Sequence, residues 1–203
     1  MSLIQSFWEV FNKSILDYHK LDNVDTKIKN PYNKEEINFL MYEKNWVDTI
    51  QWHLEDIIRN PTIDPIEALE LKRKIDASNQ IRTDKVELID DWFLVHYNNP
   101  KVLNEAKLNT ESLAWAIDRL SILALKIYHM QVEVNRKEAV VEHIEKCNKK
   151  LNILLEQKID LIEAIEDLLL EIEAGRIKMK VYRQMKMYND EELNPILYLN
   201  KNK

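Results

Sequence analysis

Two histidines and an aspartate in this sequence could carry out acid–base chemistry. His53 shares a helical face with Trp46 and Ile50, so its imidazole should point inward. Asp118 and His129 lie eleven residues apart, which places them on one face of a strongly apolar stretch. An imidazole and a carboxylate in one site can act as general base and general acid, so Asp118 and His129 are the catalytic candidates.

Other polar side chains could hold a small polar or anionic ligand beside these groups. The candidate ligand-binding residues are His53, Asp76, Asn79, Arg82, Glu87 and Lys126. Arg82 or Lys126 would bind the anion. Imidazoles with carboxylates can also bind a divalent metal, but the sequence has no H-E-x-x-H motif, so we assign no metal ligand and no cofactor. The alternative is that each group is a core polar residue satisfied by a neighbouring helix.

The stretch Asp76–Trp92 gathers polar residues on one sector of a long expected helix. These residues are Asp76, Asn79, Gln80, Thr83, Glu87 and Asp90. Arg82 instead lies in an apolar stripe with Ile75 and Val86, where the spacing predicts an apolar side chain. We expect Arg82 to form an ion pair or to reach solvent, because an unpaired buried charge is very costly.

Asp118 lies on the most apolar helix that the sequence predicts. An ordinary solvated carboxylate is therefore not expected there, unless a polar cleft reaches it. We expect Asp118 to be at least half buried and to contact a cation. Arg82 or Arg119 is the first candidate partner, followed by Lys126 or His129.

Five helices are expected to position these groups. They should span 2–18, 33–59, 64–97, 111–134 and 137–174, with a polar linker at 19–33. Asn33 and Glu36 form a capping-box pattern, and Asp64-Pro65-Ile66-Glu67 combines an N-cap with proline at the first helical position. Asn98-Asn99-Pro100 should end the third helix, and Asn109 or Thr110 should cap the fourth. On the second helix the expected apolar face consists of Ile37, Leu40, Met41, Val47, Ile50, Leu54 and Ile57.

The last two helices differ from the others in pattern. The fourth is apolar around most of its circumference, so we expect it to be central and buried. The fifth carries a stripe with heptad spacing, which predicts lengthwise packing on another helix, within the chain or across a homodimer. That stripe consists of Val140, Ile144, Cys147, Leu151, Leu154, Lys158, Leu161, Ile165, Leu168 and Ile172. Gly175 should then end the helix.

Three weaker patterns have a structural and a functional interpretation. The basic segment 176–188 could bind phosphates, or it could lie on the acidic sector of the third helix. Glu67-x-x-Glu70 and Glu87-x-x-Asp90 resemble the signature of helical nucleotide pyrophosphohydrolases, but one continuous helix would hold the two pairs far apart. Cys147 with His143 one turn before it could be a reactive thiol, or a buried structural one.

The composition favours an all-α protein inside the cell. One glycine in 203 residues is too few for tight hairpins, whereas a bundle of about five long helices with a basic C-terminal tail needs little glycine. The net charge of −6 argues against nucleic-acid binding, and a lone cysteine suits a reducing compartment. Without a signal-peptide pattern or a membrane-length apolar run, we expect a cytoplasmic protein with no membrane span. We interpret 1–203 as one domain, with 1–33 as N-terminal helix and linker and 176–203 as the tail.

Several stretches of the chain resemble the bacterial domain-of-unknown-function family 4254. They are WHLEDIIR at 52–59, KRKIDASNQIRTDKVELIDD at 72–91, AIDRLSILALKIYHM at 116–130, and VYRQMKMYND at 181–190 followed by NPILY at 194–198. The resemblance covers nearly the whole chain in four ordered motifs. It implies a helical bacterial protein of similar length, and it implies no activity.

Two hypotheses for function follow from the residues. The first is a binding or scaffold protein that uses a polar cleft between the second, third and fourth helices. The second is an enzyme acting on a small polar or phosphorylated substrate, such as a sugar- or nucleotide-linked one, through Asp118 and His129. We prefer the first, because no catalytic motif is complete. Convergence of His53, Arg82, Asp118 and His129 in one pocket would favour the second.

Overall fold

The predicted all-α bundle is confirmed. The computed structural model describes residues 1–97, 101–185 and 192–193. Its helices are α1 (Leu3–Tyr18), α2 (Ile37–Ile58), α3 (Pro65–His96), α4 (Leu113–Val134) and α5 (Val141–Glu173), and its two short strands are β1 (Lys107–Leu108) and β2 (Ile177–Lys178). The expected stop at Asn98-Asn99-Pro100 lies outside the described residues; α3 ends at His96 with Tyr97 as C-cap.

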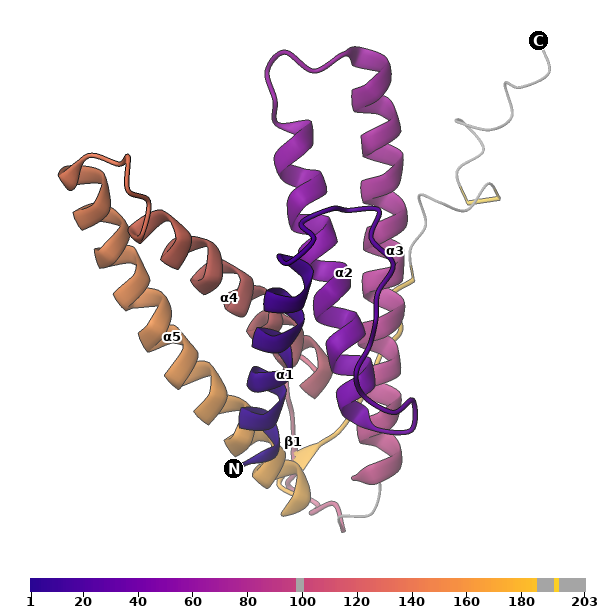
Figure 1. Ribbon diagram of the computed structural model, residues 1–203. Coiled ribbons are helices and arrows are strands. Elements are labelled where there is room, and N and C mark those ends of the chain that lie inside the picture. The colour runs from indigo at the N-terminus through magenta and orange to yellow at the C-terminus, as the bar shows by residue number, and fades with distance from the viewer. Residues whose placement is uncertain (98–100, 186–191, 194–203) are drawn as a thin grey trace.

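Two helical hairpins form the body of the molecule (Figure 1). One consists of α2 and α3, with α1 packed along α2, and the other consists of α4 and α5. The hairpins meet near β1 and diverge from there, so the far end of the α4–α5 hairpin stands apart from α2 (Figure 1). The predicted central role of the fourth helix is confirmed, because α4 contacts each of the other four helices.

Local chemistry sets where the helices begin. Asp64 caps α3 as predicted, accepting hydrogen bonds from the backbone N–H groups of Ile66 and Glu67. The predicted capping box at Asn33 is wrong: α2 begins at Ile37 after Glu36, and the Asn33 amide donates to the Glu36 carboxylate instead. The predicted caps of α4 are also wrong, because Ser112 is the N-cap and accepts from the N–H of Trp115. Each error arose because a suitable cap residue a few positions earlier lies in a turn of its own.

The apolar stripe of α5 packs along α4, within the chain, and only part of it is buried. Ile165 and Ile172 are buried in the main core, whereas Leu154 is half-buried. The helix begins at Val141 rather than at 137, and Val140 is an exposed N-cap rather than part of the buried stripe. Apart from Cys147, which is also buried, the stripe therefore becomes buried toward the C-terminal end of α5.

Gly175 ends α5 in a conformation that other residues rarely adopt. Its φ is 73°, and a Cβ at this position would lie 2.3 Å from the carbonyl oxygen of Lys101. The turn brings β2 alongside β1 as a parallel pair, with Lys107 opposite Ile177. Beyond the pair, Arg183 contacts the carboxylate of Asp91 on α3 at 2.5 Å.

Residues 183–184 of the basic segment therefore lie on the acidic side of α3, as one interpretation of the sequence expected, whereas Arg176 pairs with Glu171 of α5. Gln184 adds to this contact by donating its backbone N–H to the Glu87 carboxylate at 3.0 Å. The segment 179–185 is neither strand nor helix. The described residues do not include Lys186 or Tyr188. Of the tail at 189–203, which was expected to be irregular, they include only 192–193.

The buried face of α2 is more polar than predicted. Val47 and Ile50 are only partly buried and Ile57 is exposed, although all three were assigned to the apolar face. Polar residues occupy the buried positions instead, namely Lys44, Asn45, Asp48 and Thr49. Within residues 1–97, 101–185 and 192–193, no helix combines the length and apolar character that crossing a membrane requires.

Candidate functional site

Four charged side chains from three helices form a buried network. Lys44 and Asp48 come from α2, Arg82 from α3 and Asp118 from α4. The Lys44 ammonium contacts the Asp48 carboxylate and lies 2.7 Å from Oδ1 of Asp118. The Arg82 guanidinium donates from Nε to Oδ1 of Asp48 at 3.2 Å and from Nη2 to Oδ2 of Asp118. Two carboxylates thus share two cations.

Two uncharged side chains complete the network. Ser121 donates its hydroxyl proton to Oδ2 of Asp48 at 2.6 Å, and Asn45 donates its amide N–H to the Ser121 hydroxyl at 2.9 Å. Burial raises the pKa of Asp48 against the opposing effect of Lys44, and the negative charge of Asp118 raises it further. The buried carboxylates need the neighbouring cations, because the cations offset the free-energy cost of burying negative charge.

The expectation for Asp118 is confirmed. Only 4% of the residue is exposed, and Arg82 is one of its two cationic partners. The second partner is Lys44 rather than Arg119, because Arg119 points outward and pairs with Glu111 at 2.8 Å. The contact between Lys44 and Oδ1 of Asp118 is an ion pair by distance, without the alignment of a hydrogen bond. The network can tie α2, α3 and α4 together, and it offers a solute very little open surface.

A second cluster consists of three histidines from three parts of the chain. His19 follows α1, His53 lies on α2 and His129 lies near the end of α4. One nitrogen from each imidazole lies within 4.8 Å of the other two, and the two Nε2 atoms of His19 and His53 are 3.2 Å apart. All three residues are partly buried, so the cluster lies at the edge of the core.

Aromatic rings hold the histidines in place. Trp52 stacks on His129 with 4.7 Å between ring centroids and 4° between planes, and Tyr18 stacks on His53 at 5.2 Å. Nδ1 of His19 lies 2.7 Å from the carbonyl oxygen of Ile15, which can only accept a hydrogen bond. Nδ1 of His19 therefore carries a proton, and Nε2 is the nitrogen that faces His53.

The surroundings disfavour the charged form of His129 and His53. Burial, with the neighbouring His19 and His53 as the next causes, lowers the pKa of His129 to about 4. Burial also lowers the pKa of His53, with His19 as the next cause. At neutral pH the ring nitrogens of these two residues are available as acceptors or ligands.

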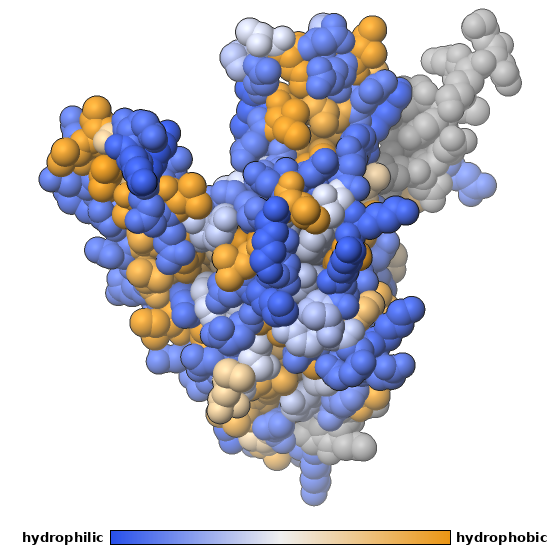
Figure 2. Space-filling view, in the orientation of Figure 1, coloured by the Kyte–Doolittle hydropathy of each residue, from blue (hydrophilic) through white to orange (hydrophobic). Residues whose placement is uncertain are grey.

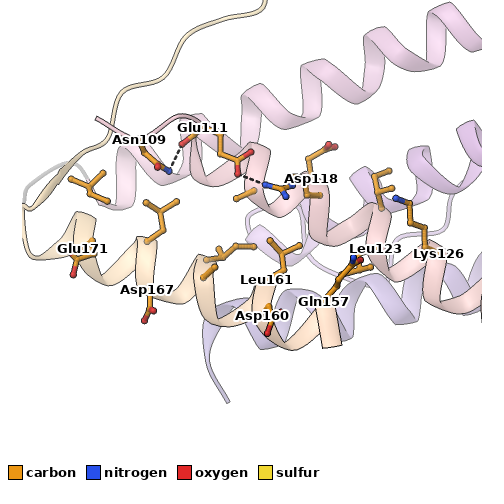
Figure 3. Close-up of a pocket in the computed structure, with 17 residues that line it drawn as sticks. Asn109, Glu111, Asp118, Leu123, Lys126, Gln157, Asp160, Leu161, Asp167 and Glu171 are labelled. Atoms are coloured by element: carbon orange, nitrogen blue, oxygen red, sulfur yellow. Dashed lines mark hydrogen bonds and ion pairs between the residues drawn. The ribbon is translucent and has the colours of Figure 1, made fainter. Parts of the chain in front are cut away.

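An open groove of about 820 Å³ runs between α4 and α5 (Figure 3). Its apolar lining includes Leu123, Leu161, Ile165 and Leu168, and its polar lining includes Asn109, Gln157, Arg119 and Lys126. Asp160, Asp167 and Glu171 also border it, but Figure 3 shows these three carboxylates directed away from α4. The groove is therefore lined by apolar and polar groups in similar measure, with Arg119 and Lys126 on the α4 side.

The predicted site residues divide between these places. Arg82 and Asp118 meet in the charged network, whereas His53 and His129 meet in the histidine cluster. Asp118 and His129 are eleven residues apart on one straight helix, which corresponds to about 16 Å. The four residues whose convergence would favour an enzyme therefore form two separate pairs.

The remaining predicted residues have other surroundings. Asp76 pairs with Lys72 one turn away on the surface of α3. The backbone carbonyl of Asn79 accepts a hydrogen bond from the Thr83 hydroxyl at 2.9 Å. Glu87 faces the basic segment, and Lys126 is exposed beside the groove. The polar cleft expected between the second, third and fourth helices is a closed charged network, and the open groove lies between α4 and α5.

Sequence reasoning missed Lys44, Asp48 and His19. The signal for the first two was present, because Lys44 and Asp48 are one helical turn apart beside the similarly spaced Asn45 and Thr49. Two such polar pairs side by side on a helix that is apolar elsewhere indicate a buried polar face. His19 gave no such signal, because it lies just past α1, in the segment assigned to the linker.

For two of the weaker sequence patterns, the structural interpretation holds rather than the functional one. Glu67 and Glu87 lie on one uninterrupted helix, which does not form the pair of antiparallel acidic helices that a pyrophosphohydrolase needs. Cys147 is buried and reduced, with Sγ 3.3 Å from Nε2 of His143.

Comparison with known proteins identifies a family without assigning an activity. No curated protein and no solved structure matches the chain. The model of the family described as "Protein of unknown function (DUF4254)" matches residues 38–181. The match covers more than half of the chain and confirms the resemblance seen in the sequence motifs, and the chain therefore belongs to this family.

Proposed function

We propose that the chain is a binding protein whose ligand is a small amphipathic anion, held in the groove between α4 and α5. The observation that carries the proposal is the groove itself. Its volume of about 820 Å³ falls in the range typical of small-molecule sites. A groove lined by both apolar and polar groups suits a ligand with an apolar body and one polar end.

The charges around the groove favour an anion over a cation. Glu111 pairs with Arg119, and Glu171 pairs with Arg176 at 2.5 Å, so two of the acidic groups at the rim are already neutralised. Lys126 is exposed and has no ion pair within the part of the chain that the structure describes. An anionic head group beside Lys126 would supply the missing partner.

The charged network supports binding over acid–base catalysis. Asp118 borders the groove, but its carboxylate is engaged by Lys44 and Arg82. A general base needs a free lone pair within hydrogen-bond reach of the proton it removes. His129 lies too far along α4 to share a small substrate with Asp118.

The expected setting of this function is the bacterial cytoplasm. We infer this location from the family resemblance and the single reduced cysteine. The acidic net charge argues against nucleic acid as the ligand.

A fluorescent amphipathic anion tests the proposal. We expect 1-anilinonaphthalene-8-sulfonate to bind the folded protein at one site, with decanoate displacing it more strongly than decyltrimethylammonium at equal concentration. Lys126→Glu should weaken dye binding by about tenfold, because a cation next to the sulfonate becomes an anion, a change worth about 1.4 kcal/mol or more.

Lys150→Glu provides the matched control for this experiment. Lys150 is an exposed lysine on α5 that does not line the groove, so the same charge reversal there should leave dye binding unchanged. Equal weakening by both substitutions would mean that the dye responds to net charge alone. Equal displacement by the two decyl compounds would contradict an anion site.

A further inference from the structure

The ring nitrogens of the histidine cluster are spaced almost as they would be around a bound metal ion. A tetrahedral zinc ion with zinc–nitrogen bonds of 2.0–2.1 Å places its ligand nitrogens about 3.3 to 3.4 Å apart. The Nε2 atoms of His19 and His53 are already 3.2 Å apart. One nitrogen from each of the three residues lies within 4.8 Å of the other two. Side-chain movements that shorten these separations by about 1.4 Å or less would give all three the spacing of zinc ligands.

The hydrogen bond from Nδ1 of His19 leaves Nε2 of the same ring facing the centre of the cluster, 3.2 Å from Nε2 of His53. Nδ1 of His19 donates to the carbonyl of Ile15, the arrangement by which metal-binding histidines are commonly oriented. Nε2 of His129 is buried and has no hydrogen-bond partner among the described residues. A buried, unpartnered ring nitrogen is costly, and a metal ion would remove that cost.

A carboxylate is available as a fourth ligand. Oδ1 of Asp22 lies 3.7 Å from Nε2 of His53. Asp22 has a positive φ of 47°, which non-glycine residues rarely adopt, and its N–H donates to the carbonyl of Tyr18 at 2.9 Å. The turn after α1 is therefore held so that Asp22 returns toward α2, and the carboxylate, being largely exposed, leaves a path from solvent.

We propose that His19, His53 and His129, with Asp22 as fourth ligand, bind one divalent transition-metal ion of the zinc type. Imidazole nitrogens and a single carboxylate suit zinc, whereas magnesium and calcium prefer oxygen ligands. The ion would join the end of α1 to α2 and α4, and this site is separate from the groove between α4 and α5.

Cobalt provides a spectroscopic probe of this site. Protein stripped of metal with a chelator should bind one Co²⁺ per chain and give the intense visible absorption of tetrahedral coordination, and Zn²⁺ should displace it. His53→Gln and His129→Gln should each weaken Zn²⁺ binding by more than about 100-fold in calorimetry, because loss even of a group that only orients a ligand costs 10- to 100-fold. Asp22→Asn should also weaken it.

Two matched controls separate the cluster from ordinary surface binding. His96→Gln removes an exposed histidine of α3 that lies outside the cluster, and Asp25→Asn removes a nearby exposed carboxylate. Both should leave Zn²⁺ affinity unchanged. Circular dichroism of each variant establishes that it is folded. If His53→Gln or His129→Gln fails to fold, imidazole ¹⁵N shifts in the unmodified protein decide, because Zn²⁺ should move only His19, His53 and His129.

Three results would overturn the proposal. One is the absence of Zn²⁺ binding to the folded protein at micromolar concentration. Another is binding that survives the loss of His53 and His129, which would place the ion elsewhere, for example at His143 and Cys147. The third is ¹⁵N shifts confined to histidines outside the cluster. None of these measurements involves the groove, so the proposed function stands or fails separately.

Discussion

At the scale of single residues, the buried face of α2 carries one positive and one negative charge, which offset each other. Lys44 and Asp48 are fully buried and belong to the same helical turn, so they could satisfy each other without any other helix. Asp118 and Arg82 add one charge of each sign from two further helices. Loss of any single group would leave the network with a net charge, so Arg82 of α3 and Asp118 of α4 depend on each other for balance.

Asp118→Asn tests whether this network is needed for folding. The substitution leaves Lys44 and Arg82 sharing one carboxylate, and an uncompensated buried charge costs about 3–5 kcal/mol. Because Arg82 is partly exposed and can reach water, we expect the free energy of unfolding to fall by an amount near the lower end of this range. Urea denaturation followed by circular dichroism measures the free energy of unfolding.

Glu111→Gln is the control for this prediction. It removes a carboxylate from the exposed pair with Arg119, and exposed pairs are worth at most about 1 kcal/mol. A loss below about 1 kcal/mol for Asp118→Asn as well would contradict a structural role. It would instead favour the hypothesis that Asp118 is kept for a ligand or a reaction.

At the scale of the elements, the sequence predicted which segments are helical, but not all of their ends. The third helix was predicted almost to the residue, because Asp64-Pro65 offers both a cap side chain and a fixed φ at the first position. The N-caps of the second and fourth helices lie three and two or three residues later than those predicted at Asn33 and at Asn109 or Thr110. A cap residue signals where a helix can begin, and tertiary contacts decide among the candidates.

A tertiary contact explains the start of α4. Asp90 of α3 accepts hydrogen bonds from the Ser112 hydroxyl at 2.8 Å and from the Ala114 N–H at 3.3 Å. Asp90 thus serves as a second cap supplied by another helix, and burial raises its pKa. Nothing in the sequence near Ser112 could reveal a partner 22 residues earlier.

The apolar stripe of α5 gives a prediction with an internal comparison. Ile165 is 1% exposed in the main core, so Ile165→Ala should lower the free energy of unfolding by about 2–5 kcal/mol. Leu154→Ala should cost less, because Leu154 is only half-buried nearer the diverging end of the hairpin. Chemical denaturation of both variants measures the difference.

Leu170→Ala is the matched control on the outer face of the same helix. Leu170 is exposed, so its truncation should change stability by about 0.5 kcal/mol or less. A loss at Leu154 as large as that at Ile165 would contradict the structure, because it would require the far part of α5 to be as deeply buried as the near part.

At the scale of the whole molecule, the candidate sites were only partly accessible from the sequence. Helical spacing correctly placed His53 facing inward and Asp118 in the core, because both belong to strongly patterned helices. Which groups meet depends on how far along each helix they lie when the helices are packed. That register separates Asp118 from His129 and brings His19 to His53, a pairing that no local pattern encodes.

The arrangement of the two hairpins also implies an uneven distribution of stability. The part of α4 up to Leu125, which includes Ile117, is enclosed by the other helices, whereas Val132 near its end is exposed. Beyond it, Val141 and Ile153 of α5 are exposed too, and Figure 2 shows apolar surface at this end of the α4–α5 hairpin. Opening this end breaks few buried contacts, so it should cost much less free energy than opening the centre of α4.

Hydrogen exchange followed by mass spectrometry tests this distribution. We expect peptides covering 117–125 to exchange most slowly, near the rate set by global unfolding, and helical peptides within 131–150 to exchange much faster. The first turn of α3, exposed at 65–70, should also exchange quickly and serves as an internal reference. Slow exchange at 131–150 that becomes faster on dilution would mean that a second copy of the chain covers the exposed apolar residues. Slow exchange there at every concentration would contradict the structure itself.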